Sequence, residues 1–179
     1  MKDKSKRNQE YFKIVEYNSD YKKKYKELNY EWIEKYFKIE PSDEKILSDP
    51  EKEIIDNNGF IFFALFNDEV IGTCTLIRHD DETYELSKLS VTENYKGKGA
   101  GEKLVDTAIL KARGLGVKKI FLYTNKKLEA AFNLYNKKGF KVIRKPENLI
   151  SNYTRESLYM DYNLNNDCDK DKLKLLLFL

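Results

Sequence analysis

The residues whose types and spacing most clearly indicate chemistry lie in the segment VTENYKGKGAGEKL, at positions 91–104 of the 179-residue chain. Three glycines, at positions 97, 99 and 101, precede apolar residues with helical spacing. Such glycines let several backbone N–H groups point outward at the end of a helix where its dipole favours an anion. Lys96 and Lys98 add positive charge beside them. We therefore expect this segment to bind phosphate groups.

Two common phosphate-binding loops do not fit this segment. A dinucleotide-binding fingerprint is Gly-x-Gly-x-x-Gly within a strand–helix–strand unit, whereas here Gly-x-Gly-x-Gly follows three consecutive predicted strands. A mononucleotide-binding loop ends in Gly-Lys-Ser/Thr, which the segment lacks. Taken alone, the segment also fits an ordinary glycine-rich loop that begins a helix.

A second pattern lies downstream, in LYTNKKLEAAFNLYNKKGFKVI at positions 122–143. A predicted strand precedes a helical stripe that includes Leu128, Ala131, Phe132 and Tyr135. Gly139 suits the left-handed residue that ends a helix, and another predicted strand follows it.

Together the two patterns resemble those of the GNAT superfamily of acetyl-CoA-dependent N-acetyltransferases. The loop of that superfamily reads Arg/Gln-x-x-Gly-x-Gly/Ala, which Lys96 to Gly101 match with lysine in the first place. Its second region contains Leu-Tyr-x-x-x-Gly-Phe, here Leu134 to Phe140. The resemblance covers roughly residues 12–163 and is strongest over 60–143. It implies a GNAT-type mixed α/β fold, in which about four helices flank a central, mostly antiparallel sheet that splays into a V.

The resemblance also implies a reaction. An acceptor amine attacks acetyl-CoA directly in a ternary complex, without a metal, while backbone groups of the strand before the loop hold the pantetheine arm and polarise the thioester carbonyl. Asn125 has an alternative interpretation as the cap of the following helix. The implied cofactor-binding residues are Leu89, Ser90, Val91, Lys96, Gly97, Lys98, Gly99, Ala100, Gly101 and Asn125.

Tyr135 and Glu85 are the predicted catalytic residues. By resemblance, the Tyr135 phenol protonates the departing CoA thiolate, although a tyrosine in this helical stripe can also simply pack, with its hydroxyl on a backbone carbonyl. Glu85 is the candidate base that keeps the acceptor amine neutral, and the alternative is a solvated glutamate at a strand edge. Glu40 and Asp43 are weaker candidates for the same role.

The acceptor is not specified by the sequence. An aromatic-rich first helix, with Tyr25, Tyr30, Trp32 and Tyr36, either lines the acceptor pocket or packs in the core. A small molecule is favoured because no additional recognition domain is evident, and acetylation of a peptide or protein amine is the alternative. A non-catalytic acyl-CoA-binding module is a further alternative, against which the retained Tyr135 argues.

The elements that must position these residues follow from hydrophobic spacing, in the order β–α–α–β–β–β–α–β–α–β–β. The helix expected over 19–37 is capped by Ser19 or Asp20, and Pro41 precedes a second helical stretch. Residues 60–66 are continuously apolar, as in a strand buried on both faces, and the strands at 70–77 and 84–91 complete a meander. In the last of these, a bulge would direct Leu86 and Leu89 to the same side, and the alternative is a regular strand covered on both sides. Further strands are expected at 12–15, 117–123, 140–143 and 153–164, and helical stripes at 104–112 and 128–135.

Domain organisation and composition complete these expectations. We expect a disordered leader at 1–10, one acetyltransferase domain at 11–164, and a tail at 165–179 that docks as a helix, self-associates or stays mobile.

The 33 Lys and Arg residues nearly balance the 30 Asp and Glu residues, which argues against nucleic-acid binding. Cys74 reads as a small buried residue, and a single His79 disfavours a histidine metal site. No apolar run is long enough to cross a bilayer. We expect a cytoplasmic protein without membrane partners and, by resemblance, a possible homodimer.

Overall fold

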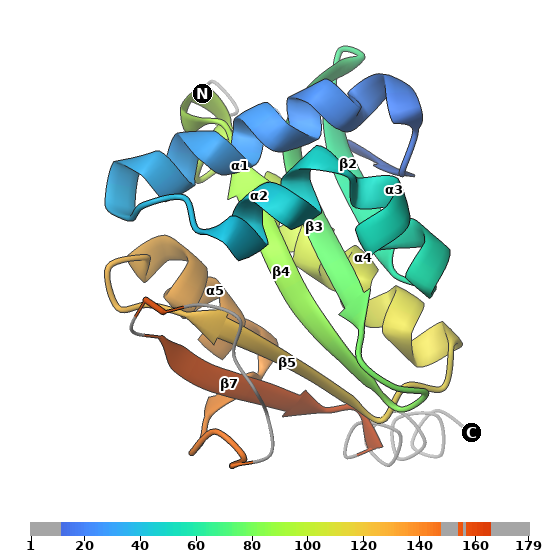
Figure 1. Cartoon of the computed structure of the whole chain (residues 1–179), viewed down its shortest axis with the longest axis vertical. Coiled ribbons are helices and arrows are strands. Elements are labelled where there is room, and N and C mark those ends of the chain that lie inside the picture. Colours follow the sequence, from blue (N-terminus) through green and yellow to red (C-terminus); the bar gives the residue numbers. More distant parts are fainter. Residues whose placement is uncertain (1–11, 148–153, 156, 166–179) are drawn as a thin grey trace, which may run out of the picture.

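A computed structural model describes residues 12–147, 154–155 and 157–165 of the chain (Figure 1). The predicted leader at 1–10, the tail beyond residue 165 and Tyr153 lie outside these residues. The predicted domain limits therefore stay predictions. None of the helices in the described part of the chain combines the length and the apolar character that crossing a bilayer requires.

The described residues form one sheet of seven strands in the order β1-β2-β3-β4-β5-β7-β6. Only the β4–β5 pair is parallel, and the other neighbouring pairs are antiparallel. The predicted mixed α/β class with a mostly antiparallel sheet is therefore confirmed. The strands are β1 (Lys13–Glu16), β2 (Phe60–Phe66), β3 (Glu69–Arg78), β4 (Thr83–Val91), β5 (Lys119–Thr124), β6 (Lys141–Val142) and β7 (Leu158–Asn163).

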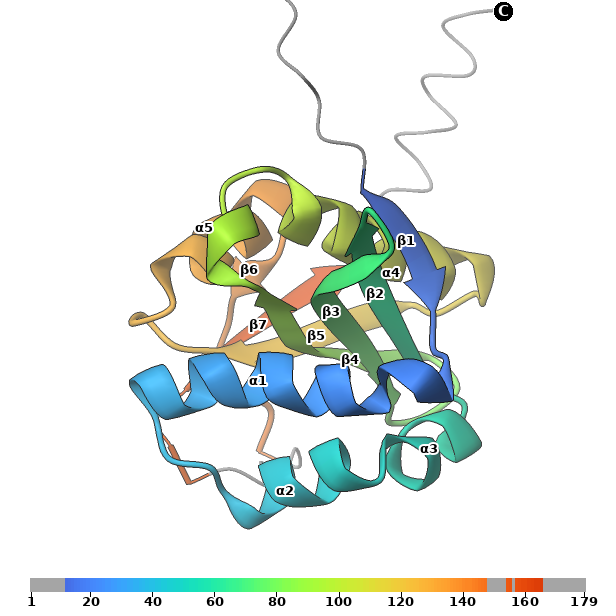
Figure 2. The ribbon, with the colours of Figure 1, turned by 90° about the horizontal axis from the view of Figure 1, so that it is seen from above.

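Helices cover both faces of the sheet, with α1, α2 and α3 on one side and α4 and α5 on the other (Figure 2). The predicted element order is confirmed, with α3 as an addition, because Pro41 and Pro50 each stand at the first position of a short helix, where proline is favoured. The expected caps Ser19 and Asp20 were wrong, since Asn18 accepts the hydrogen bond from the Asp20 N–H. The helices are α1 (Lys22–Tyr36), α2 (Pro41–Ser48), α3 (Pro50–Glu53), α4 (Ala100–Gly114) and α5 (Glu129–Lys138).

The β2 strand is buried on both faces, as its continuous apolar sequence predicts. Phe62 and Ala64 belong to the core beneath α4, whereas Ile61 and Phe63 belong to the core beneath α1 and α2. Cys74 is fully buried, and burial raises the pKa of its thiol to about 12. Cys74 therefore serves as a small apolar core residue and not as a nucleophile.

The sheet opens between β4 and β5. Only Thr83–Glu85 of β4 pair with β5, opposite Lys119–Phe121. Beyond Glu85 the two strands diverge, and β5 continues along β7 on its other side (Figure 1). The predicted V is therefore confirmed, and none of the described strands neighbours this edge of β4 over residues 86–91.

The predicted bulge lies in β4 at the mouth of this opening. Thr75 pairs with Ser87 and Thr73 pairs with Ser90, so Lys88 and Leu89 both lie opposite Cys74 alone. The bulge brings Leu86 and Leu89 to the same core. Its geometry requires a positive φ of 52° at Lys88, which is uncommon for a residue with a side chain.

Leu104 on α4 tests how much the core beneath the sheet contributes to stability. Its side chain is fully buried, so Leu104→Ala should lower the free energy of unfolding by about 2–5 kcal/mol. Leu110→Ala on the same helix is the matched control, because Leu110 is 64% exposed, and its effect should stay within about 0.5 kcal/mol. Urea unfolding of both variants measures the difference, and equal losses would contradict the assigned burial.

Candidate functional site

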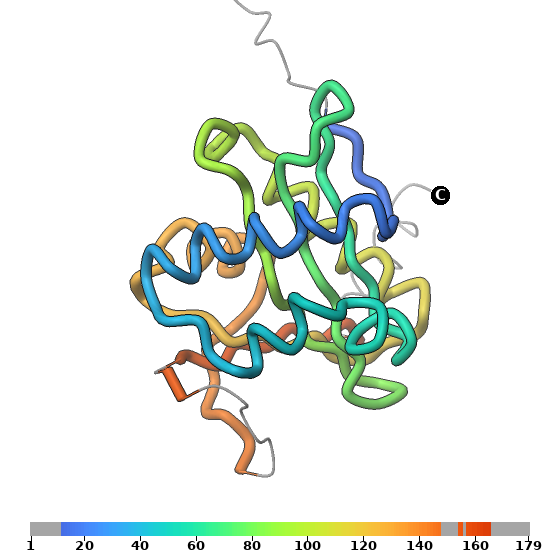
Figure 3. The backbone as a smooth tube through the Cα atoms, turned by 45° about the horizontal axis from the view of Figure 1, so that its top comes forward, coloured from blue at the N-terminus to red at the C-terminus, as the bar shows by residue number. Residues whose placement is uncertain are grey.

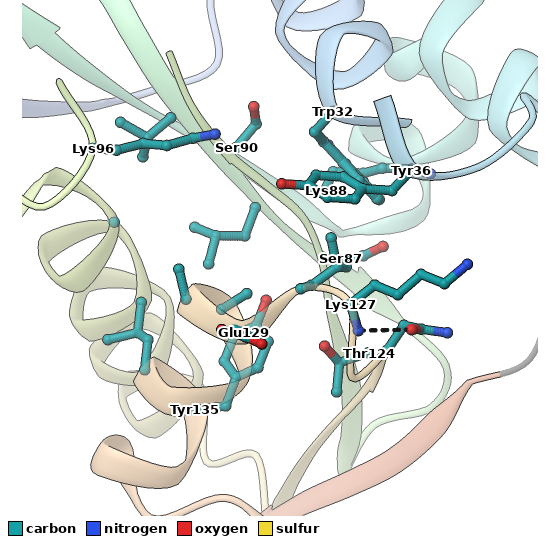
Figure 4. Close-up of a pocket in the computed structure, with 18 of the residues that line it drawn as sticks. Trp32, Tyr36, Ser87, Lys88, Ser90, Lys96, Thr124, Lys127, Glu129 and Tyr135 are labelled. Atoms are coloured by element: carbon teal, nitrogen blue, oxygen red, sulfur yellow. Dashed lines mark hydrogen bonds between the residues drawn. The ribbon is translucent and has the colours of Figure 1, made fainter. Parts of the chain in front are cut away.

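A cavity of about 730 Å³ occupies the opening between β4 and β5. Its walls come from the free edge of β4, the loop at 96–101, the end of β5, the start of α5 and the C-terminal turn of α1. Figure 4 shows Tyr135 of α5 on the opposite side of this cavity from Ser90 and Lys88 of β4. The topology thus brings the two sequence patterns together across one hollow.

The glycine loop has the geometry of an anion site. Gly97 and Gly99 have φ values of +73° and +97°, and a Cβ on either would meet nothing within 4 Å. Gly99 is the N-cap of α4 and no side chain caps this helix, so the N–H groups of its first turn are available to an anion. Gly101 differs, because a Cβ there would make ordinary contacts with the side chains of Val91 and Leu134.

The predicted positive charges around the loop are only partly directed at the cavity. Lys96 lines it, with its ammonium 2.7 Å from a carboxylate oxygen of Glu93. Lys98 lies over the Tyr95 ring and is not among the lining residues. Ala100 does not line the cavity either, because its side chain packs in the core beneath the sheet.

Tyr135 packs in the core and also lines the cavity. It is 6% exposed, and its ring lies 5.8 Å from that of Phe140. Burial, followed by the proximity of Cys74, raises the pKa of its hydroxyl far above the usual value of 10. Among the described residues this hydroxyl has no hydrogen-bond partner, so the backbone carbonyl that the packing interpretation expected is not found.

Glu85 also lines the cavity, at the point where β4 and β5 part. It is 8% exposed, and its Oε2 lies 3.0 Å from Nε2 of His79, the residue that directly follows β3. The His79 ring in turn meets the edge of Phe121 on β5, with 4.8 Å between ring centroids. Glu85 is therefore a buried, paired carboxylate and not the solvated strand-edge residue of the alternative interpretation.

Leu89 and Val91 line the cavity with Ser90, but the three side chains have different surroundings. Leu89 and Val91 pack against the core beneath α4, whereas the Ser90 hydroxyl donates to the carbonyl of Leu28 on α1. We therefore expect backbone groups of β4, and not these side chains, to form the polar contacts with a ligand in the opening.

Asn125 lines the cavity without capping a helix. Its side-chain oxygen accepts from the N–H of Lys127, and its carbonyl accepts from Leu128, which closes a turn before α5 (Figure 4). The expected helix cap was wrong because α5 begins later, at Glu129.

Two of the four singled-out aromatic residues of α1 line the cavity, namely Trp32 and Tyr36. Tyr25 is fully buried beneath the helix and its hydroxyl meets that of Thr75, while Tyr30 bonds Glu44 at the exposed surface. The core interpretation is therefore confirmed for Tyr25, whereas the acceptor-pocket interpretation stays a prediction for Trp32 and Tyr36.

Several lining residues were not predicted from the sequence. The hydroxyls of Tyr123 and Thr124 are buried and lack a hydrogen-bond partner within the described ranges, and both residues line the cavity. Tyr123 also borders a neighbouring cavity of about 350 Å³, together with Arg155 and Tyr159. In the sequence, Lys88 stands out only as a charged residue within an apolar strand, and nothing around Arg155 indicates a site residue.

The weaker candidates Glu40 and Asp43 do not line the cavity. Asp43 is fully buried and pairs with Lys88 and Arg155. Glu40 accepts hydrogen bonds from the N–H groups of Thr154 and Arg155. Both carboxylates thus join chain segments around the opening.

Comparison with known proteins adds to this geometry. The sequence pattern of the acetyltransferase (GNAT) family matches residues 25–140, which include the loop, the bulge and Tyr135. The chain belongs to this family.

Two of the curated relatives are described as uncharacterized N-acetyltransferases. The chain is 34% identical over 100 residues to the uncharacterized N-acetyltransferase YvbK of Bacillus subtilis, a match of 54% of this chain and 64% of that protein. It is 33% identical over 96 residues to the uncharacterized N-acetyltransferase Mb2688 of Mycobacterium bovis, 57% of whose length is covered. The chain thus spans less than two thirds of these curated relatives.

Solved GNAT structures match over most of the chain. A GNAT-family acetyltransferase from Staphylococcus aureus Mu50 has a TM-score of 0.76 and 28% identity, covering 86% of this chain and 99% of that one. A GNAT-family acetyltransferase from Elizabethkingia anophelis with acetyl-CoA bound has a TM-score of 0.56 and 25% identity, covering 86% and 98%. The fold prediction is thereby confirmed independently of the element order.

Glu102, in the first turn of α4, should make stability depend on pH. Hydrogen bonds from Lys137 and Lys138 of α5 hold its pKa at about 2, below the usual 4.5. The ionised carboxylate therefore stabilises the fold above pH 4.5, and this contribution is lost as the pH falls toward 2. Because the pair is partly exposed, Glu102→Gln should cost less than about 1 kcal/mol at pH 7.

Urea unfolding at several pH values tests this link between α4 and α5. The deficit of Glu102→Gln should shrink as the pH falls below 4.5. Glu69→Gln, at the exposed first residue of β3, is the control and should leave stability unchanged at every pH. A Glu102→Gln deficit of constant size across this range would show that the charge of Glu102 is not its cause.

Proposed function

We propose that this chain is a cytoplasmic enzyme that transfers the acetyl group of acetyl-CoA to a primary amine of a small-molecule acceptor. The observation that carries the proposal is the juxtaposition across one cavity of an uncapped helix N-terminus, a strand edge without a neighbour and the Tyr135 hydroxyl. Together they match, in order, the pyrophosphate, the pantetheine arm and the thioester of acetyl-CoA.

The residues of the cavity fit this cosubstrate. Gly97 and Gly99 keep their left-handed backbone clear of side chains, so phosphate oxygens can approach the first-turn N–H groups of α4. The edge of β4 over 86–91 offers main-chain donors and acceptors for an extended amide chain, as an added strand would use them. At the bulge, the Leu89 N–H is the candidate donor to the thioester carbonyl oxygen.

Tyr135 serves as the general acid. The acceptor nitrogen bonds to the acetyl carbon, the carbon–sulfur bond breaks, and Tyr135 donates its proton to the leaving sulfur. The nitrogen loses one proton as it becomes an amide, and a proton passed on through water restores the Tyr135 phenol. Burial raises the pKa of Tyr135, so the phenol carries its proton at neutral pH. A thiolate is already a tolerable leaving group, so the acid accelerates the step without being indispensable.

Glu85 serves as the base that receives a proton from the acceptor ammonium, directly or through water. Its position supports this role, because it lies at the vertex of the opening with one oxygen held by His79. Tyr123 and Thr124 supply hydroxyls to the same region, which a polar acceptor would satisfy on binding. Trp32 and Tyr36 form the facing wall, which supports a compact acceptor.

Cosubstrate binding tests the loop. Gly99→Glu places a negative side chain where phosphate is expected, so its affinity for acetyl-CoA should fall at least tenfold, about 1.4 kcal/mol. Gly116→Glu is the matched control, because Gly116 also has a positive φ with open space around it but does not line the cavity. Isothermal titration calorimetry should give wild-type affinity for the control. A folded wild-type protein that binds no acetyl-CoA would refute the proposed function.

Removal of the Tyr135 hydroxyl tests the acid. With an amine found by a thiol-release screen, Tyr135→Phe should lower kcat by roughly 10- to 100-fold while the affinity for CoA stays unchanged. Tyr84→Phe is the control, since its hydroxyl bonds the Asn58 carbonyl away from the cavity. Unchanged kcat in Tyr135→Phe would leave Tyr135 as a packing residue only.

A further inference from the structure

A buried charge cluster lies beside the cavity and has no part in the proposed chemistry. The Lys88 ammonium lies 2.6 Å from Oδ1 of Asp43, and the two side chains are 2% and 0% exposed. The Arg155 guanidinium donates to both oxygens of the same carboxylate, at 2.9 and 3.0 Å. Three separate parts of the chain therefore meet at one carboxylate. Figure 3 shows the segment at 154–155 close to the connection between α1 and α2.

Asp43 is held firmly at this meeting point. It lies in the first turn of α2, where its Oδ2 also accepts a hydrogen bond from the Glu40 N–H. The cations beside it hold the pKa of Asp43 below its usual value although burial opposes this, so the carboxylate is ionised at neutral pH. A buried carboxylate with this many partners is a fixed anchor for whatever it binds.

Lys88 stands at the bulge of β4 in a conformation that its side chain does not favour. Its φ of 52° lies in the left-handed region, which glycine adopts far more readily. A buried ammonium is also costly unless it is paired. Both costs are offset when the ammonium reaches Asp43, so the ion pair and the left-handed backbone at Lys88 depend on each other.

The next residue along the chain is Leu89, whose N–H is the candidate donor to the thioester oxygen. The peptide that joins Lys88 to Leu89 is oriented by the backbone angles of Lys88. These two residues share a single opposite residue on β3, and no strand in the described part of the chain lies on their other side, so the ladder alone does not fix them. The side chain of Lys88 supplies a fixing point that the sheet lacks.

We propose that Lys88 is a positioning residue for acetyl transfer, whose ion pair with Asp43 orients the Leu89 N–H toward the thioester carbonyl. This inference rests on the proposed function. It requires that loss of the ion pair weakens polarisation of the thioester, while the phosphate end of the cosubstrate site stays intact. Lys88 itself touches no reacting atom in this account.

The infrared carbonyl band of bound acetyl-CoA tests this inference without a known acceptor. Acetyl-CoA carrying ¹³C in its acetyl carbonyl is compared free and bound to the full-length protein, since a hydrogen bond to the oxygen lowers the stretching frequency. The band should shift down in the wild type. In Lys88→Met, which keeps an unbranched side chain one atom shorter and removes its charge, at least half of this shift should be lost. Affinity for CoA by calorimetry should stay within about twofold of the wild type.

A second Lys88 variant and a control lysine variant complete the infrared comparison. Lys88→Gly removes the ammonium but relieves the left-handed backbone, so it remains informative if Lys88→Met does not fold, and it should also lose the band shift. Lys26→Met is the matched control, because the Lys26 ammonium joins Glu44 of α2 at 2.8 Å on the exposed surface. It should keep the full shift.

The possible results distinguish failure of this inference from failure of the proposed acetyltransferase function. A wild-type shift that persists in both Lys88 variants would overturn the inference, as would a bound wild-type band with no shift. Loss of CoA affinity in step with the shift would also overturn it, because Lys88 would then support the whole site. A wild type that binds no acetyl-CoA would refute the proposed function itself.

Discussion

The short parallel pairing of β4 with β5 is the constraint on which the rest of the structure depends. Three residue pairs hold the strands together at Thr83–Glu85, and beyond them the sheet divides. Separation leaves main-chain groups of β4 without a neighbour, a cost that most sheets avoid. Under the proposed function, the pantetheine arm of acetyl-CoA would provide the missing partner, so these main-chain groups would form their hydrogen bonds with the bound molecule.

Packing on the two faces of the sheet keeps the opening from closing. The core beneath α4 includes Leu86, Leu122 and Tyr135, which belong to both sides of the division. On the other face, Ser90 bonds the carbonyl of Leu28 on α1, and Tyr25 bonds Thr75. Beside the opening, Asp43 joins α2 to Lys88 and Arg155. Buried contacts therefore support the walls of the cavity that come from β4, β5, α1 and α5.

Much of this architecture could be predicted from local patterns, and the exceptions have physical causes. The apolar run of β2, the helical stripe of α4 and Gly139 at the end of α5 are governed by interactions close in sequence, which spacing reveals. The spacing of Leu86 and Leu89 even indicated the bulge. By contrast, the Asn18 cap was missed because Asn, Ser and Asp are near-equivalent in that role.

The site could be predicted where a motif marks it and not where distant segments meet. Gly97, Gly99 and Tyr135 came from recognisable patterns, whereas the cluster of Asp43, Lys88 and Arg155 joins residues 45 and 112 positions apart. Burial of Glu85 against His79 likewise depends on the register of β3 with β4, which a single sequence does not display. Side chains that act through tertiary pairing leave no local signal.

Backbone amide mapping tests the central claim, that acetyl-CoA occupies the sheet opening, most directly. In a ¹⁵N-labelled sample titrated with acetyl-CoA, the largest chemical-shift changes should fall on the amides of residues 89–91 and 97–102, with smaller changes at the start of α5. Changes confined to other surfaces, or no changes at saturating concentration in a folded sample, would contradict the account.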